Sequence, residues 1–102
     1  MVDPNIQKIT EYLKSEFCPT RIFLFGSRAQ GTAGENSDYD FVVVTEKPTD
    51  SKWVDYDKAR NFILQHFGVR ADVWVYSQST FEEWKNEFGS IPETALNTGV
   101  EL

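Results

Sequence analysis

The chain has 102 residues, of which 40% are hydrophobic and 15% aromatic. This is enough apolar material for one packed core, and the length leaves little room for a second, so we expect a single domain over residues 1–102. Sixteen acidic residues against ten basic ones give a net charge of −6. That charge argues against broad electrostatic binding to duplex nucleic acid or to an anionic membrane, because both need a basic surface.

Cysteine content and the lengths of the apolar runs narrow the class of protein further. Cys18 is the only cysteine, which excludes an intrachain disulfide and a cysteine-based zinc cluster. The first residues lack the cationic and apolar segments of a signal peptide. The longest apolar runs, such as Ile22–Phe25 and Phe41–Val44, have four residues, whereas a membrane span needs about 20. We therefore expect a soluble, cytoplasmic protein without a membrane partner.

The first half of the chain predicts a helix, a buried strand, a tight turn and a second strand. Asp3-Pro4 is a helix-start signal, and Pro19 ends the helix. Four apolar residues recur between them at helical spacing: Ile6, Ile9, Leu13 and Phe17. Arg21–Phe25 predicts a buried strand, followed by the glycine-rich stretch Gly26–Gly34. Asp38–Val44, rich in β-branched and aromatic residues, predicts the next strand.

The middle of the chain predicts a second long helix and a third strand. Pro48-Thr49-Asp50-Ser51 interrupts the strand pattern and offers a cap for a helix that begins near Lys52. An apolar stripe follows along this helix: Trp53, Tyr56, Ile63 and Phe67. Gly68 is placed to end it, and Ala71–Tyr76 predicts the third strand.

The C-terminal part predicts a further helix and a short tail. Ser79 and Glu82 have the spacing of a capping box. Three aromatic residues before Gly89 would share one helix face: Phe81, Trp84 and Phe88. Residues 91–102 predict a helical turn after Pro92 and a brief extended end. The whole order indicates an α/β fold, with a small mixed sheet and helices packed mainly on one face.

The strongest local motif is the strand end followed by Gly26-Ser27. Glycine has no side chain, so a phosphate can approach its backbone closely, and Ser27 adds a hydroxyl donor. The alternative is an ordinary strand-to-helix turn with a serine cap. For the pair alone this alternative is favoured, because short glycine motifs are common.

Two aspartates open the second predicted strand. Asp38 and Asp40 are two positions apart, so their carboxylates share one face while Tyr39 and Phe41 face the other. Adjacent carboxylates repel unless a cation joins them, and Mg²⁺ prefers such oxygen ligands together with waters and phosphates. An acidic turn at the edge of a hairpin is the alternative reading. A pair at the start of an apolar strand favours the metal.

A third carboxylate, Asp72, opens the third predicted strand. Beside Asp38 and Asp40 it would complete a cluster for two Mg²⁺ ions, which can clamp the attacking and leaving oxygens of a phosphoryl or nucleotidyl transfer. Asp72 could also accept the proton of the attacking hydroxyl. On its own, Asp72 is equally well read as a solvated strand start paired with Arg70.

Together these segments resemble the DNA polymerase beta-like nucleotidyltransferase superfamily. The resemblance rests on Gly26-Ser27, on Ser37–Asp40 running into a strand, and on Asp72 opening the next one, and it spans residues 21–76. The short length is similar to the minimal nucleotidyltransferase (MNT) branch, whose members are commonly antitoxins paired with HEPN-domain toxins. The three segments in this order are a far more specific signature than any one of them.

The resemblance implies a role for each matching residue. Asp38 and Asp40 would be paired metal ligands, and Asp72 the third ligand, which also activates the acceptor hydroxyl. Gly26 and Ser27 would hold the β- and γ-phosphates of ATP. The implied reaction is Mg²⁺-dependent transfer of AMP to a tyrosine of a cognate HEPN toxin, which silences the toxin. Gln30 departs from the pattern, because many relatives carry arginine there.

Two other functions compete with this interpretation. A non-catalytic module of the same fold could neutralise a HEPN partner by contact alone. The three aspartates Asp38, Asp40 and Asp72 argue against it, because a pure binder does not need them. An enzyme that nucleotidylates a small molecule ranks last, since such relatives usually carry an additional helical domain. The sequence leaves a monomer, a homo-oligomer and a mixed complex open.

The remaining candidates have structural interpretations. His66, the only histidine, lies near a predicted helix end, where an imidazole suits the helix dipole. The tryptophans and most phenylalanines lie at core-facing spacings, although exposed ones could bind a partner. Arg28 could contact a phosphate or solvate the loop, and the two readings are equally weighted.

Overall fold

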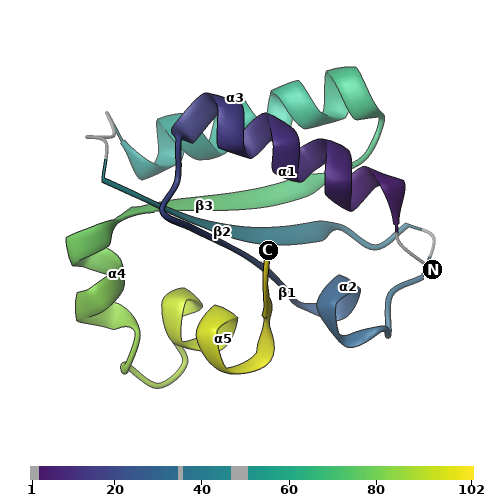
Figure 1. Ribbon diagram of the computed structural model, residues 1–102. Helices are drawn as coiled ribbons and strands as arrows, with labels where there is room; N and C mark the ends of the chain where they lie inside the picture. The colour runs from purple at the N-terminus through teal and green to yellow at the C-terminus, as the bar shows by residue number, and fades with distance from the viewer. Residues whose placement is uncertain (1–2, 35, 47–50) are drawn as a thin grey trace.

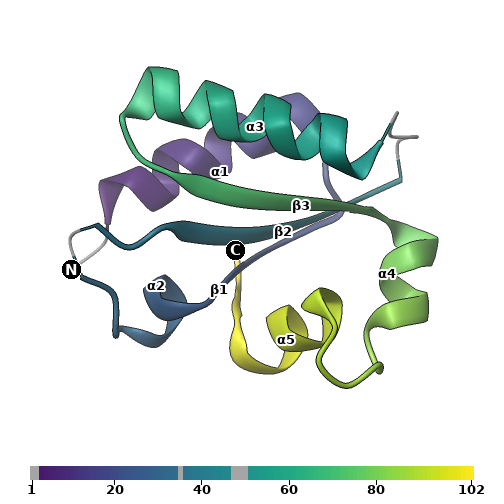
Figure 2. The same ribbon diagram turned by 180° about the vertical axis from the view of Figure 1, so that it is seen from behind.

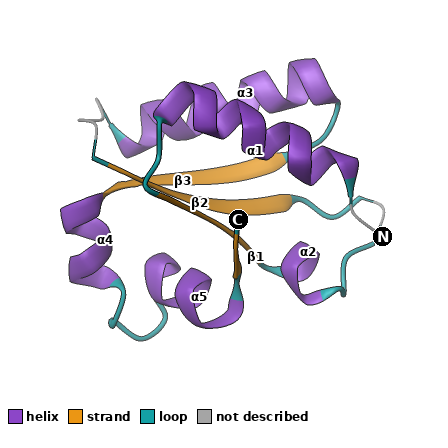
Figure 3. Ribbon diagram, viewed as in Figure 1, coloured by secondary structure: helices purple, strands orange, loops and turns teal. Residues whose placement is uncertain are grey.

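A computed structural model describes residues 3–34, 36–46 and 51–102 of the chain. Its helices and strands alternate along most of the sequence (Figures 1 and 3). In chain order they are α1 (Pro4–Phe17), β1 (Arg21–Phe25), α2 (Ser27–Gln30), β2 (Tyr39–Thr45), α3 (Lys52–Phe67), β3 (Ala71–Ser77), α4 (Gln78–Trp84), α5 (Ile91–Thr98) and β4 (Val100–Glu101).

The strands form one mixed sheet in the order β3-β2-β1-β4. β1 is antiparallel to both β2 and β4, whereas β2 and β3 are parallel. A parallel pair needs a crossover connection, and α3 supplies it. The predicted α/β fold with a small mixed sheet is confirmed.

Helices cover the two faces of the sheet unequally. The long helices α1 and α3 lie on one face, and the shorter α4 and α5 cover part of the other (Figures 1 and 2). Alternating strand residues divide into two cores accordingly. Phe41 and Val43 of β2 belong to the core beneath α1 and α3, while Val42 and Val44 belong to the core on the α4 and α5 side.

Most predicted helix ends are confirmed. The Asp3 side chain accepts a hydrogen bond from the Asn5 amide and caps α1, and Cys18 after the helix has a left-handed backbone with φ 46°. Ser51 caps α3 and Gly68 ends it. Residues 48–50, the rest of the predicted capping segment, lie outside the described residues. Within the described ranges, no helix is long and apolar enough to cross a membrane.

The predicted helix after β3 is wrong in its cap and its end. Ser77, not Ser79, caps α4, because its hydroxyl accepts from the Thr80 amide. β3 runs directly into the helix, so the cap coincides with the last strand residue. α4 ends at Trp84, so Phe88 lies beyond the helix, and its side chain is 98% exposed.

The predicted packing of two tryptophans is also wrong. Trp53 on α3 is 59% exposed, and Trp84 on α4 is 46% exposed. Trp53 packs edge-on against Trp74 at the outer edge of the sheet, with ring centroids 5.7 Å apart. The buried residues of α3 are Asp55, Ala59 and Ile63, and only Ile63 of these belongs to the predicted stripe.

Candidate active site

The centre of the candidate site is a pair of carboxylates on the parallel strands. The register of β2 and β3 places Asp40 directly beside Asp72. Because alternate strand residues share a face, both carboxylates lie on the same side as Val42 and Trp74, away from α1 and α3. The parallel register therefore brings together two of the predicted site residues that are far apart in sequence.

Gly26 lies against the carboxylate of Asp40. Its strand neighbour Phe25 pairs with Asp40 in the antiparallel register of β1 and β2. A Cβ atom on Gly26 would stand 2.5 Å from Oδ2 of Asp40, closer than real side chains allow, and the φ of Gly26 is +75°. Glycine suits this position, because an L side chain is strained at this φ and its Cβ would force the Asp40 side chain to shift. Ser27 follows as the first residue of α2.

The electrostatic surroundings of Asp40 disfavour its charged form. Burial raises the pKa of this carboxyl to about 6, with further contributions from the charge of Asp72, a hydrogen bond with Asp72 and the charge of Asp38. A carboxylate in this position gains from any cation placed between it and Asp72. The arrangement is typical of a site that holds a cation.

The raised pKa of Asp40 predicts a pH-dependent stability of the metal-free protein. Between pH 3.8 and about 6, Asp40 keeps a proton in the folded state, whereas the unfolded chain, with an ordinary pKa of 3.8, has lost it. The stabilising contribution is therefore complete below pH 3.8 and is lost as the pH rises through about 6. In thermal unfolding with a chelator, Asp40→Asn should weaken this dependence between pH 4 and 6. Parallel curves for the two proteins would contradict the assignment.

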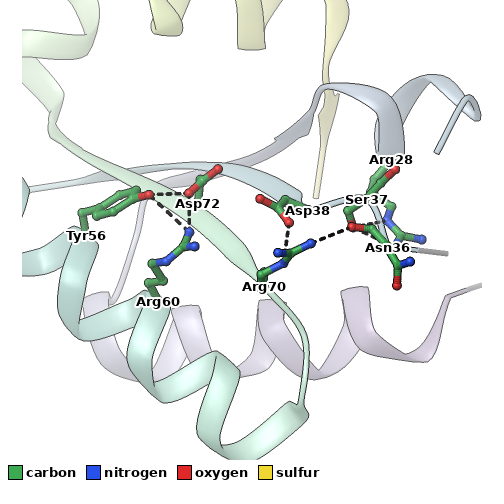
Figure 4. Close-up of polar contacts among 8 residues, drawn as sticks. All are labelled: Arg28, Asn36, Ser37, Asp38, Tyr56, Arg60, Arg70 and Asp72. Carbon is green, nitrogen blue, oxygen red and sulfur yellow. Dashed lines mark hydrogen bonds and ion pairs between the residues drawn. The ribbon is translucent and has the colours of Figure 1, made fainter. Parts of the chain in front are cut away.

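Asp38 lies just before β2 and is held by an arginine. Nε of Arg70 is 3.0 Å from Oδ1 of Asp38, and the same guanidinium donates to the Asn36 carbonyl (Figure 4). Arg28 fixes the preceding residue, because it donates to the Ser37 carbonyl at 2.8 Å. A pocket of about 420 Å³ borders Asp38, Arg28 and Arg70. Both arginines thus contact the segment that leads into Asp38.

Asp72 is held from the outer edge of the sheet. Arg60 donates from Nη1 to Oδ1 of Asp72 at 2.8 Å, and the Tyr56 hydroxyl donates a short hydrogen bond to the same oxygen (Figure 4). Tyr56 and Arg60 both come from α3, one turn apart, and reach around the edge strand β3. Oδ2 of Asp72 takes part in neither contact.

The three predicted carboxylates are therefore only partly assembled. Asp40 and Asp72 are adjacent, whereas Asp38 is directed to Arg70. Among the described residues, no three acidic, histidine or cysteine side chains are gathered in a ready metal cluster. Two carboxylates remain an adequate protein contribution for Mg²⁺, which completes its octahedral shell with waters and phosphates.

The sequence offers Arg70 as a partner for Asp72, but in the structure Arg70 pairs with Asp38 and Arg60 pairs with Asp72. For Arg28 the sequence predicts either contact with a phosphate or solvation of the loop. In the structure Arg28 donates to the Ser37 carbonyl, and its guanidinium lies 4.3 Å from the centroid of the Tyr39 ring, so it holds the segment before β2. Tyr56 was assigned to the apolar stripe. Tyr56 and Arg60 are four residues apart, and residues at this spacing share a helix face. The spacing therefore indicates that both side chains can reach the same partner.

Comparison with known families shows the class of protein to which this fold belongs. The nucleotidyltransferase domain model matches residues 6–100. The chain belongs to this family.

Two solved structures show the same fold. One is described as "Crystal structure of the toxin-antitoxin with AMP-PNP"; it is 19% identical, with a TM-score of 0.66, over 99% of this chain and 72% of that one. The other is a putative nucleotidyltransferase from Sulfolobus solfataricus, 22% identical, with a TM-score of 0.52, over 78% of this chain and 70% of that one. A comparison with curated proteins gives no match.

Proposed function

We propose that this chain is a minimal nucleotidyltransferase that transfers AMP from ATP to a tyrosine hydroxyl of a HEPN-type toxin and so acts as its cytoplasmic antitoxin. The observation that carries the proposal is the placement of Asp40 beside Asp72, next to a glycine that admits no side chain. Family membership supports the reaction class. The net charge of −6 favours a protein acceptor over a long nucleic acid.

Mg²⁺ is the cofactor that this donor set suits. Asp40 and Asp72 would hold it, and Asp38 would join them on release from Arg70. The fit rests on the carboxylate of Asp72 beside Asp40, whose pKa burial and the charge of Asp72 raise, and on the space that Gly26 leaves beside Oδ2 of Asp40. When bound, two such ions would neutralise the triphosphate and favour ionisation of the attacking hydroxyl.

The chain's own residues would divide the remaining work. The backbone at Gly26 and the hydroxyl of Ser27 would bind the β- and γ-phosphates, so that pyrophosphate leaves on the β1 side. Asp72 would accept the proton of the acceptor hydroxyl. The partner would supply the acceptor tyrosine.

Coexpression with the HEPN protein encoded nearest to this chain, in a genome that has one, tests the proposal. Intact-mass analysis should show one or more AMP additions to the partner, and peptide mapping should place them on tyrosine. The double variant Asp38→Asn/Asp40→Asn should leave the partner unmodified. An unmodified partner beside the wild-type chain would overturn the transferase.

The salt bridges of the site favour a second candidate, a non-catalytic antitoxin. Arg70 engages Asp38 and Arg60 engages Asp72, so two of the three carboxylates have protein partners without any metal. A module of this kind would inhibit its partner by contact. Inhibition by the double variant as strong as by the wild type, with no added mass on the partner, would support this function.

A further inference from the structure

Tyr56 occupies the position that an acceptor hydroxyl would need. Its phenolic oxygen donates a short hydrogen bond to Oδ1 of Asp72, the carboxylate to which the proposed function gives the acceptor proton. A general base must lie within hydrogen-bond reach of the proton that it removes, and this contact satisfies that requirement. Figure 4 shows the hydroxyl directed at the carboxylate from α3.

The sheet places Tyr56 opposite the phosphate-binding side. Phe25, which precedes Gly26, pairs with Asp40, Asp40 pairs with Asp72, and Asp72 contacts Tyr56 beyond the edge strand. Neighbouring strands are about 4.8 Å apart, so these groups form one row across the sheet. A triphosphate with its terminal phosphates at Gly26 would extend along this row towards Tyr56. In such a row the leaving group and the attacking oxygen lie on opposite sides of the carboxylate pair, as an in-line displacement requires.

We propose that Tyr56 is itself a nucleotide acceptor, so that the chain modifies its own tyrosine when no partner is bound. This inference rests on the proposed function. The Tyr56 oxygen attacks the α-phosphorus of a nucleoside triphosphate, and its proton passes to Asp72. The bond from the α-phosphorus to the β-phosphate oxygen breaks and pyrophosphate leaves. The product is a phosphodiester that joins the nucleoside to Tyr56.

The surroundings of Tyr56 hold the hydroxyl in place and favour the reaction. Its ring packs on Trp74, with centroids 4.8 Å apart, and meets Trp53 edge-on at 5.8 Å. Nη1 of Arg60 lies 3.4 Å from the Tyr56 oxygen, where a positive charge stabilises both a developing phenolate and the phosphodiester formed from it. Tyr56 is only half-buried, so part of its side chain is open to solvent.

The other tyrosines are placed less well for this role. The Tyr39 hydroxyl donates to Asp3 at 2.5 Å, from the core beneath α1. The Tyr12 ring stacks on Phe62, with centroids 3.9 Å apart. Tyr76 is buried at 8% exposure on the α4 side. Modification should therefore be confined to Tyr56.

Self-modification would also limit the enzyme. A nucleotide on Tyr56 would lie against Asp72 and Arg60, where an external acceptor hydroxyl must enter. A partner that inserts its own tyrosine has to displace the Tyr56 hydroxyl from Asp72. Partner binding and modification of Tyr56 are thus expected to compete.

Incubation of the purified chain with ATP and MgCl₂, without partner, tests the inference. Intact mass should increase by one AMP, and peptide mapping should place it on Tyr56. Tyr56→Phe should lose this gain, while Tyr76→Phe, a matched loss of one hydroxyl, should keep it. The wild-type chain alone can overturn the inference. It would do so if its mass did not increase, or if the added AMP mapped to a residue other than Tyr56.

A further comparison separates the inference from the proposed function. Transfer to the HEPN partner with an unmodified Tyr56 would overturn the inference alone, whereas loss of both reactions would overturn both.

Discussion

Asp40→Asn and Asp72→Asn should each reduce nucleotidyl transfer by roughly 10²–10⁴-fold while the fold is retained. Asparagine has nearly the same shape as aspartate but carries no charge, so it weakens cation binding at either position. At position 72 it also removes the proton acceptor. Initial rates of pyrophosphate release with the partner as acceptor would measure the loss, and thermal unfolding would verify the fold.

Asp57→Asn is the matched control for these variants. Asp57 lies on the same helix as Tyr56, one residue further on, and is exposed. Asp57→Asn removes the same single negative charge as the two site variants. A general change in the protein's electrostatic field would therefore lower the transfer rate of all three variants equally. Wild-type rates for Asp40→Asn and Asp72→Asn would refute the carboxylate mechanism. An equal loss for all three variants would indicate a general charge effect.

Gly26→Ala should damage both folding and transfer. The added Cβ would stand 2.5 Å from Oδ2 of Asp40, and the backbone conformation, φ +75° and ψ −159°, is one that only glycine adopts readily. We expect a loss of about 1–3 kcal/mol in the free energy of unfolding from the backbone strain alone. The rate of transfer should fall further than the loss of stability explains, because the Asp40 side chain must move away from Asp72. Denaturant unfolding and transfer rates measure the two effects separately.

Gly31→Ala separates backbone strain from crowding. Gly31 ends α2 with the same φ of +75°, but no atom lies within 4 Å of its added Cβ. Its left-handed conformation costs alanine about 1 kcal/mol. Transfer per folded molecule should therefore remain at the wild-type level. If Gly26→Ala behaved in the same way, the close approach to Asp40 would have no functional importance.

Much of the fold could be predicted because the local signals agree with the tertiary structure. Asp3-Pro4, Ser51 and Gly68 act within a few residues of their own positions, and the structure places helix ends at each. The errors arose where long-range packing decides. Ser79 has good capping chemistry, but β3 passes directly into α4 and makes Ser77 the cap. Phe88 has the right helical spacing, but the helix has already ended.

The carboxylate pair could be inferred from sequence, but the groups that hold it could not. Asp40 and Asp72 each open a strand, so parallel pairing makes them neighbours. The engagement of Asp38 by Arg70 depends on the path of the connection before β3. The approach of Tyr56 to Asp72 depends on how α3 crosses the edge of the sheet. Neither path has a local sequence signal.

The position of Asp72 on an edge strand has a consequence for motion. Within the described ranges, β3 pairs with β2 alone, and the two strands are connected through a helix of 16 residues. An ion shared by Asp40 and Asp72 would act as a cross-link between these strands and resist their fraying. Amide hydrogen exchange along β3 should therefore slow when nucleotide and Mg²⁺ bind, while exchange in α1 stays the same.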